Sequence, residues 1–262
     1  MFPNRLVTTM GGNVFKDEYS VKFDASDDYI THGNNFNLGT ANFTLGMWVK
    51  SSAWADGDTR YLMAKKEDGN IFWYLRINTS GYLHFHSAIS DGSGGSTTSV
   101  YHVDNTDLST YDGQWMHIMI SCSRAGNLIY YVNGAAIVSK GVGSLSAHNL
   151  NNSGTFVIGS HTPTSGFDFD GQISEYYIFN SALSASEVAT YYNSGRTMDV
   201  LNGPKMANMK GWFRCGDGSE GGKYDANAKI YNMSTRGNYF HSNNGTMTNM
   251  LPNDIVLDAP PS

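Results

Sequence analysis

The sequence has little positive charge. Lysine and arginine together number 17 against 23 aspartates and glutamates, which gives a formal net charge of −6 for 262 residues. Charged residues of both signs make up 15% of the chain, whereas about a quarter is usual in soluble domains. A protein that binds nucleic acid needs a surplus of basic side chains to neutralise phosphates. The composition therefore argues against a nucleic-acid partner.

Long apolar runs and cysteine pairs are also scarce. No stretch approaches the roughly 18 apolar residues of a membrane-spanning helix, and residues 1–13 contain no apolar run of signal-peptide length. We therefore expect neither a Sec-type signal peptide nor membrane insertion. Cys122 lies in an apolar, strand-like run and Cys215 lies beside Trp212 and Phe213. These surroundings favour two small buried side chains over a disulfide.

Glutamate is rare too, although sugar-cleaving sites often depend on it. The chain has only Glu18, Glu67, Glu175, Glu187 and Glu220. Aromatic residues, in contrast, reach 13%, and there are 29 glycines. Aromatic strand formers placed between small turn residues favour β-sheet over helix.

Short apolar or alternating segments recur from Tyr19 onward, between clusters of Gly, Asn, Asp and Ser. This spacing is typical of an antiparallel sandwich or barrel. Residues 78–81 and 124–127 have the composition of tight hairpin turns. The predicted strands are 19–23, 43–50, 61–65, 72–77, 82–87, 115–123, 128–132, 155–159 and 171–179.

One helix is predicted, over residues 184–193. Ser184 and Glu187 have the spacing of a capping box, and Gly195 can end the helix. Residues 89–99 are rich in Gly and Ser and are expected to form a mobile surface loop. Such a loop either carries binding residues or simply connects two strands.

Five segments resemble motifs of the concanavalin A-like laminin G domains and follow one another in that family's order. They are 19–30 (similar to FDG-x-DDYV), 43–49 (FTIEAWV), 113–118 (GQWHHI), 128–134 (LYVNG) and 158–184 (IG…FxGxIDEVRIYNRALS). The resemblance covers residues 19–195. It implies an all-β fold, a two-sheet antiparallel jelly-roll sandwich with one short helix.

The C-terminal part departs from the order of that family. Residues 211–217 and 241–247 resemble the segment that normally precedes the first strand. We divide the chain into an N-terminal arm (1–18), a laminin G-like domain (19–200) and a C-terminal extension (201–262). The extension either returns to complete the sandwich, begins a truncated second copy, or adds a strand to a neighbouring subunit.

One predicted hairpin, 72–87, offers a candidate sugar-binding face. Alternation directs Trp73, Leu75, Leu83 and Phe85 to the core. The opposite face combines rings that can stack on sugars with donors for hydroxyl or acid groups. Trp54 and Tyr61 can add two more rings if the loop between them folds over this face. The predicted carbohydrate-binding residues are Tyr74, Arg76, Tyr82, His84, His86, Trp54 and Tyr61. Solvent-facing strands also carry such residues without a ligand, which is the alternative.

The resemblance further implies a metal-bearing rim. Asp27, Asp28 and Asp170 are its candidate ligands, and Ca²⁺ suits such oxygen donors; the alternative is that they hold turns. Glucanases of this fold place acids as Glu-x-Asp-x-x-Glu on one strand. That spacing is missing here, and Asp168 and Asp170 alternate without a glutamate partner. We therefore predict that the protein is not an enzyme.

The extension adds a functional resemblance. Laminin G-like chains with a tail such as residues 246–256 resemble those of tailed bacteriophages. This predicts a virion surface protein (head decoration, tail or fibre component) made in the host cytoplasm, whose partners are other virion proteins or identical subunits. Its lectin-like domain is expected to bind a host-surface glycan. The alternatives are a purely structural decoration protein and, less favoured, a glycoside hydrolase.

Overall fold

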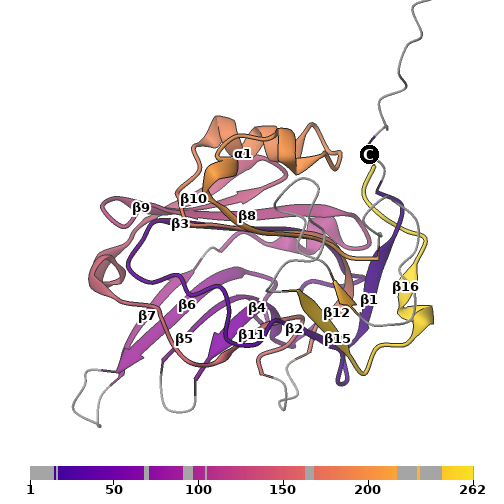
Figure 1. Cartoon of the computed structure of the whole chain (residues 1–262), viewed down its shortest axis with the longest axis horizontal. Coiled ribbons are helices and arrows are strands. Elements are labelled where there is room, and N and C mark those ends of the chain that lie inside the picture. Colours follow the sequence, from indigo (N-terminus) through magenta and orange to yellow (C-terminus); the bar gives the residue numbers. More distant parts are fainter. Residues whose placement is uncertain are drawn as a thin grey trace, which may run out of the picture.

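The protein is a sandwich of two antiparallel sheets (Figure 1). The structure is a computed structural model and describes residues 15, 17–67, 71–90, 97–103, 105–162, 168–216, 229–230 and 244–261. Within these residues each sheet has eight strands. The fold class predicted from the sequence is confirmed.

The first sheet, sheet A, has the order β10-β9-β8-β3-β12-β1-β16, and β13 also pairs with β12. Its strands are β1 (Ser20–Asp24), β3 (Phe43–Lys50), β8 (Met116–Cys122), β9 (Asn127–Val132), β10 (Ala135–Gly141), β12 (Asp170–Phe179), β13 (Met209–Arg214) and β16 (Ile255–Val256). Alternation along β8 directs Met116, Ile118 and Ile120 into the core between the sheets. His117 and Met119 point to the outer face of sheet A.

The second sheet, sheet B, has the order β14-β15-β2-β11-β4-β5-β6-β7. Its strands are β2 (Tyr29–Thr31), β4 (Arg60–Lys66), β5 (Phe72–Ile77), β6 (Leu83–Ser90), β7 (Thr97–Val103), β11 (Thr155–Ile158), β14 (Lys229–Ile230) and β15 (Gly245–Thr248). The prediction of a loop over 89–99 is corrected at both ends. Ile89 pairs with Thr98 and Ser90 with Thr97, because the hairpin extends that far. Residues 91–96 lie outside the described residues.

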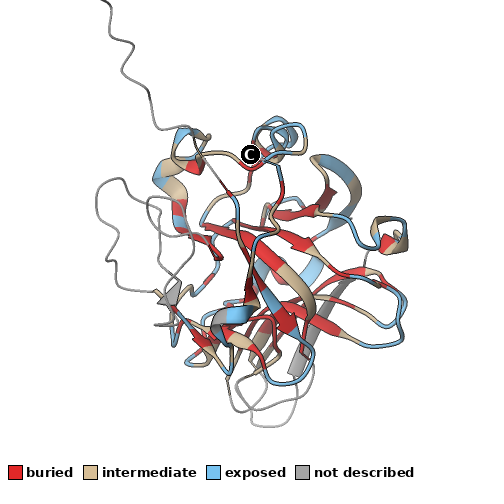
Figure 2. Cartoon of the chain, turned by 90° about the vertical axis from the view of Figure 1, so that its right-hand side faces the viewer, coloured by how far each residue is buried: buried red, intermediate tan, exposed pale blue. Residues whose placement is uncertain are grey.

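Two separate apolar layers stabilise this arrangement. The layer between the sheets includes Phe23, Phe43, Trp73 and Phe85, none of which is exposed. A second layer lies on the outer face of sheet A, beneath the helix α1 (Ala185–Tyr192). Figure 2 shows buried residues along the strands and exposed residues concentrated in loops. Both cysteines are buried and free, as predicted.

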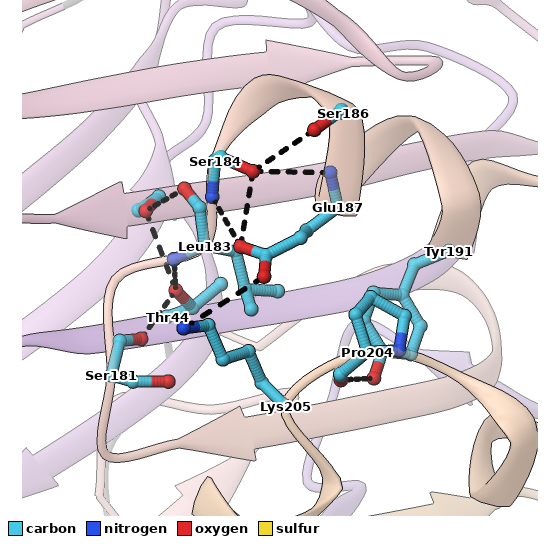
Figure 3. A network of polar contacts seen from close by, with 10 residues as sticks. Thr44, Ser181, Leu183, Ser184, Ser186, Glu187, Tyr191, Pro204 and Lys205 are labelled. Carbon is cyan, nitrogen blue, oxygen red and sulfur yellow. Dashed lines mark hydrogen bonds and ion pairs between the residues drawn. The ribbon is translucent and has the colours of Figure 1, made fainter.

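The start of α1 is bonded to sheet A (Figure 3). The capping box is present: the Ser184 amide donates to Glu187 Oε2 (2.8 Å), and the Glu187 amide donates to Ser184 Oγ (3.3 Å). The Leu183 amide also donates to Thr44 Oγ1 on β3 (3.1 Å). The helix ends at Asn193, in the left-handed conformation (φ 49°), two residues before the glycine expected to end it.

Short 3₁₀ turns occur in the connections: η1 (Leu108–Tyr111), η2 (Gly143–Ala147), η3 (Val200–Asn202), η4 (Met206–Asn208) and η5 (Pro252–Asp254). Within the described part of the chain, every helix is too short or too polar to cross a bilayer.

The C-terminal part of the chain supplies strands to both sheets. In sheet A, β1 pairs with residues 170–173 of β12 and β13 with residues 175–179, so the two strands follow one another along the same edge. β16 pairs with β1, and in sheet B β15 pairs with β2. Figure 1 shows the yellow C-terminal strand β16 beside the indigo β1.

Candidate functional site

A group of aromatic and basic side chains lies on the outer face of sheet B. Residues that face each other across a ladder share one surface. The pairs are Lys66 with Phe72, Ala64 with Tyr74 and Tyr61 with Arg76 between β4 and β5, and Tyr74 with His86 and Arg76 with His84 between β5 and β6. We call Tyr61, Lys66, Phe72, Tyr74, Arg76, His84, His86 and the adjacent His161 the sheet B patch.

Ring contacts connect the members of the sheet B patch. Phe72 stacks on Tyr74 with centroids 4.4 Å apart, and Tyr61 meets Tyr74 edge to face at 5.0 Å. His161 comes from the connection between β11 and β12. Its ring lies 4.6 Å from Tyr61 and 4.8 Å from Tyr74, and its Nε2 is 2.7 Å from the Tyr74 hydroxyl. These contacts fix the ring orientations without help from a ligand.

The polar groups of the sheet B patch are arranged around the rings. Arg76 Nη1 donates to the Tyr61 hydroxyl (3.0 Å), and the guanidinium carbon lies 5.6 Å from the Tyr61 ring centroid. Burial, and secondarily the charge of Arg76, lowers the pKa of His86 to about 4. Burial and then Lys66 and Arg76 lower the pKa of His161 to about 4 as well. Both imidazoles are therefore neutral at pH 7, when each has one donor and one acceptor nitrogen.

The members of the sheet B patch differ in how much surface they offer. Tyr74 is 3% exposed, and Tyr61 and His86 are each 6% exposed. The half-buried members are Lys66, Phe72, Arg76 and His161. A ligand on this face would therefore touch the half-buried members, while the buried rings hold them in place.

The predicted carbohydrate-binding residues divide into two groups. Tyr61, Tyr74, Arg76, His84 and His86 lie together in the sheet B patch, and the predicted alternation of this hairpin is confirmed by its register. The other two, Tyr82 and Trp54, lie outside the strands that carry the patch.

Tyr82 lies at the turn before β6, half-buried, with its amide bonded to Asn78 Oδ1. The prediction for Trp54 is corrected, because its side chain is completely buried between the sheets. The indole stacks on Phe169 and donates to the Tyr111 carbonyl, which holds the loop inward.

Three members of the sheet B patch were missed by the sequence reading. Phe72 shares the alternation of Tyr74 and was recoverable by extending the same pattern by two residues. Lys66 was recoverable only once β4 and β5 were known to pair. His161 lies far along the chain in an irregular connection, so no local signal marks it.

Three aspartates gather at the rim of the sandwich, where β1 ends. Carboxylate oxygens of Asp24, Asp27 and Asp28 all lie within 4.8 Å of one another. Asp28 is 3% exposed and accepts from the Asp24 amide (3.1 Å). Burial and the charge of Asp24 raise the pKa of Asp28 to about 7. Oxygen donors at this spacing suit a hard cation such as Ca²⁺.

This arrangement only partly matches the predicted metal ligands. Asp27 and Asp28 are in the group, whereas Asp170 is outside it and pairs with Asp24 across the β1–β12 ladder. Asp24 takes the third place. Asp24 directly follows the predicted strand 19–23, and the sequence analysis assigned a metal role only to Asp27 and Asp28 of that motif.

A pair of carboxylates, separate from the three aspartates, lies beneath the surface of sheet A. Asp17 and Glu175 flank Arg214, each with a carboxylate oxygen 3.8 Å from a guanidinium nitrogen. Both acidic side chains are 0% exposed. A substrate cannot reach them, so they do not form the accessible acid pair that glycoside hydrolysis requires.

Comparisons with known proteins extend these observations. The chain is 23% identical over 199 residues to botulinum neurotoxin type E of Clostridium butyricum, a match that covers 72% of this chain and 15% of the neurotoxin. It is 24% identical over 169 residues to the adhesion G-protein coupled receptor V1 of Danio rerio, which covers 62% of this chain and 2% of the receptor. The chain thus spans a small part of each of these relatives.

A solved structure and a family model agree on the fold. A putative carbohydrate binding protein from Bacteroides ovatus superposes with a TM-score of 0.55 at 18% identity, covering 95% of this chain and 62% of that protein. The laminin G model described as the concanavalin A-like lectin/glucanases superfamily matches residues 24–189. Because this match covers more than half of the chain and includes both sheets, the protein belongs to the concanavalin A-like lectin/glucanases superfamily.

Proposed function

We propose that the protein is a non-catalytic, lectin-like module that binds a glycan on the sheet B patch. The observation that carries this proposal is the placement of Phe72, Arg76 and His161 at the surface of one ring cluster. A flat ring can stack on the C–H face of a sugar, and guanidinium and imidazole groups can bond its hydroxyls. Buried tyrosines behind them keep these groups in place, so binding needs little reordering.

The resemblance to proteins of tailed phages supports a more specific proposal. The module acts on a virion surface, where it packs against other virion proteins or identical subunits and adheres to the host. Imaging the protein within intact particles tests this location. A particle preparation that lacks the protein would contradict it.

A second candidate is a decoration protein that binds no sugar. The observation in its favour is the low exposure of Tyr61, Tyr74, His84 and His86, which are 3–7% exposed. In that case the rings serve only to pack the outer face of sheet B. The binding experiment below separates the two candidates.

Replacing Phe72 by alanine tests the glycan site. We expect the purified protein to bind members of a glycan array and the Phe72→Ala variant to bind them at least tenfold more weakly, which corresponds to about 1.4 kcal/mol. The physical reason is that the variant loses the half-buried ring on which we propose that the sugar stacks. Titration of the best array hit by calorimetry gives the affinity ratio.

The matched control is Tyr192→Ala, which removes a half-buried ring from α1 on the opposite side of the sandwich. This variant should bind as the wild type does. If the wild type binds no sugar on the array, the result would favour the decoration protein. Release of reducing ends from a bound glycan would contradict the non-catalytic proposal.

We also propose that Asp24, Asp27 and Asp28 hold Ca²⁺ at the rim. A cation that binds only the folded state raises its stability, by about 2.7 kcal/mol at a hundredfold excess over Kd. Thermal unfolding should therefore occur at a higher temperature in Ca²⁺ than in a chelator, and Asp27→Asn should abolish the difference. Asp58→Asn, a change at a 76%-exposed carboxylate, is the control. Equal melting temperatures of the wild type in both buffers would refute the site.

A further inference from the structure

The charged side chains of the sheet B patch are all basic. Arg76 and Lys66 are both half-buried, and they lie in different rows of the patch. Lys66 faces Phe72, whereas Arg76 faces Tyr61, two rows away. These rows are four positions apart on β5, which corresponds to about 13 Å along the strand. The two cations therefore stand at opposite ends of the ring cluster.

This local charge contrasts with the rest of the chain, whose formal net charge is −6. The charged groups that lower the pKa values of His86 and His161 include Arg76, which acts on both imidazoles, and Lys66, which acts on His161. The aspartates of the rim gather elsewhere, at the end of β1. Arg76 and Lys66 can therefore attract an anionic group, an interaction that a neutral sugar does not use.

The positions of the donors favour an anion as well. The hydrogen bond to the Tyr61 hydroxyl (3.0 Å) and the contact with the Tyr61 ring orient the Arg76 guanidinium. A planar guanidinium recognises carboxylate and sulfate oxygens in a bidentate manner. His161, held by the Tyr74 hydroxyl, adds a polar group at the same surface.

From these observations we infer that the glycan bound by the sheet B patch is acidic, with a carboxylate or sulfate group that pairs with Arg76. This inference rests on the proposed glycan-binding function and specifies its ligand class. Phe72 provides the stacking surface for the sugar ring, and Lys66 contributes charge at the far end. Both carboxylated and sulfated sugars present the required planar or tetrahedral array of anionic oxygens.

Matched pairs of sugars that differ only in charge test the inference. The array carries polygalacturonate with its methyl ester, sialyllactose with lactose, and sulfated with unsulfated galactans. We expect at least tenfold tighter binding to the acidic member of at least one pair, and weaker binding as salt increases. The carboxylated and sulfated pairs identify which anion is preferred.

Two substitutions assign the effect to the sheet B patch. Arg76→Gln should lower affinity for the acidic member at least tenfold and abolish the preference, whereas Arg76→Lys should retain part of it. Lys140→Gln makes the same charge change at an exposed site on β10 of sheet A and should change nothing. If Arg76→Gln fails to fold, as judged by its thermal unfolding, Lys66→Gln replaces it.

The possible outcomes are distinct. Equal binding of acidic and neutral members, or a preference for neutral ones, overturns the inference and leaves the glycan-binding function standing. An acidic preference that survives Arg76→Gln also overturns it. No binding to any sugar on the array removes the proposed function and the inference together.

Discussion

A chain that lacks residues 203–262 is expected to lose cooperative folding. This deletion removes β13, β14, β15 and β16, and with them Trp212 (2% exposed), Phe213 (0%) and Cys215 (0%). Burial of one large apolar side chain contributes about 1.5–3 kcal/mol, and a whole domain has only about 5–15 kcal/mol of stability. The deletion also exposes the edge of β12. Soluble yield, near-ultraviolet circular dichroism and size-exclusion chromatography measure the result.

A graded version of the same experiment uses point variants. Phe213→Ala should cost about 3–5 kcal/mol of unfolding free energy in urea, the usual range for a fully buried phenylalanine. Leu257→Ala lies in the same extension but changes a side chain that is 74% exposed, so it should stay within about 0.5 kcal/mol of the wild type. A soluble truncated monomer with an unchanged melting temperature would contradict the expectation. A stable dimer of the full-length chain would instead favour exchange of the extension between subunits.

Replacement of Arg214 by leucine should cost about 3–5 kcal/mol, the usual effect of removing one partner of a buried ion cluster. The guanidinium lies between the carboxylates of Asp17 and Glu175, and its side chain is 6% exposed while theirs are 0% exposed. Ser174 Oγ donates to Asp17 (2.6 Å) and the Tyr177 hydroxyl donates to Glu175 (2.9 Å). These bonds keep both acids buried when the positive charge is lost. Urea unfolding at pH 7 measures the change.

Second substitutions identify the cause of that loss. Adding Glu175→Gln to Arg214→Leu should recover part of the stability, because it removes one of the two buried negative charges that Arg214 faces. Arg196→Leu, at an exposed position, is the control and should have little effect. Glu175→Gln is also measured in the wild type. If it lowers the stability of Arg214→Leu by as much as it lowers that of the wild type, burial of charge is not the cause of the loss.

Strand positions followed closely from the sequence wherever one face of a strand meets the core. The predicted ranges 43–50 and 72–77 coincide with β3 and β5, because alternation over six or more residues is a local property. β10 was missed, and its burial explains why: it is an edge strand without a fully buried residue, so it carries no clear alternation. The connection 89–99 was misread because its strand residues are small and polar.

The candidate site was recovered mostly within one hairpin, and Tyr61 of β4 is the one predicted member from outside it. Tyr74, Arg76, His84 and His86 share a face because they are two residues apart on paired strands. Trp54 has the same chemistry, yet its loop folds inward and its indole fills the end of the core. Nothing in the residue type or its neighbours in the sequence distinguishes a tryptophan at a binding surface from one buried in the core.

The amino-acid sequence was sufficient for the family, the sandwich and the alternation of the central hairpin, since each depends on residues close together in the chain. Tertiary structure decided the rest. It brought His161 against Tyr61 and Tyr74, placed Asp24 beside Asp27 and Asp28, and laid β13 along β12 next to β1. Contacts between distant segments depend on how the whole core closes, and a local pattern contains no information about that closure.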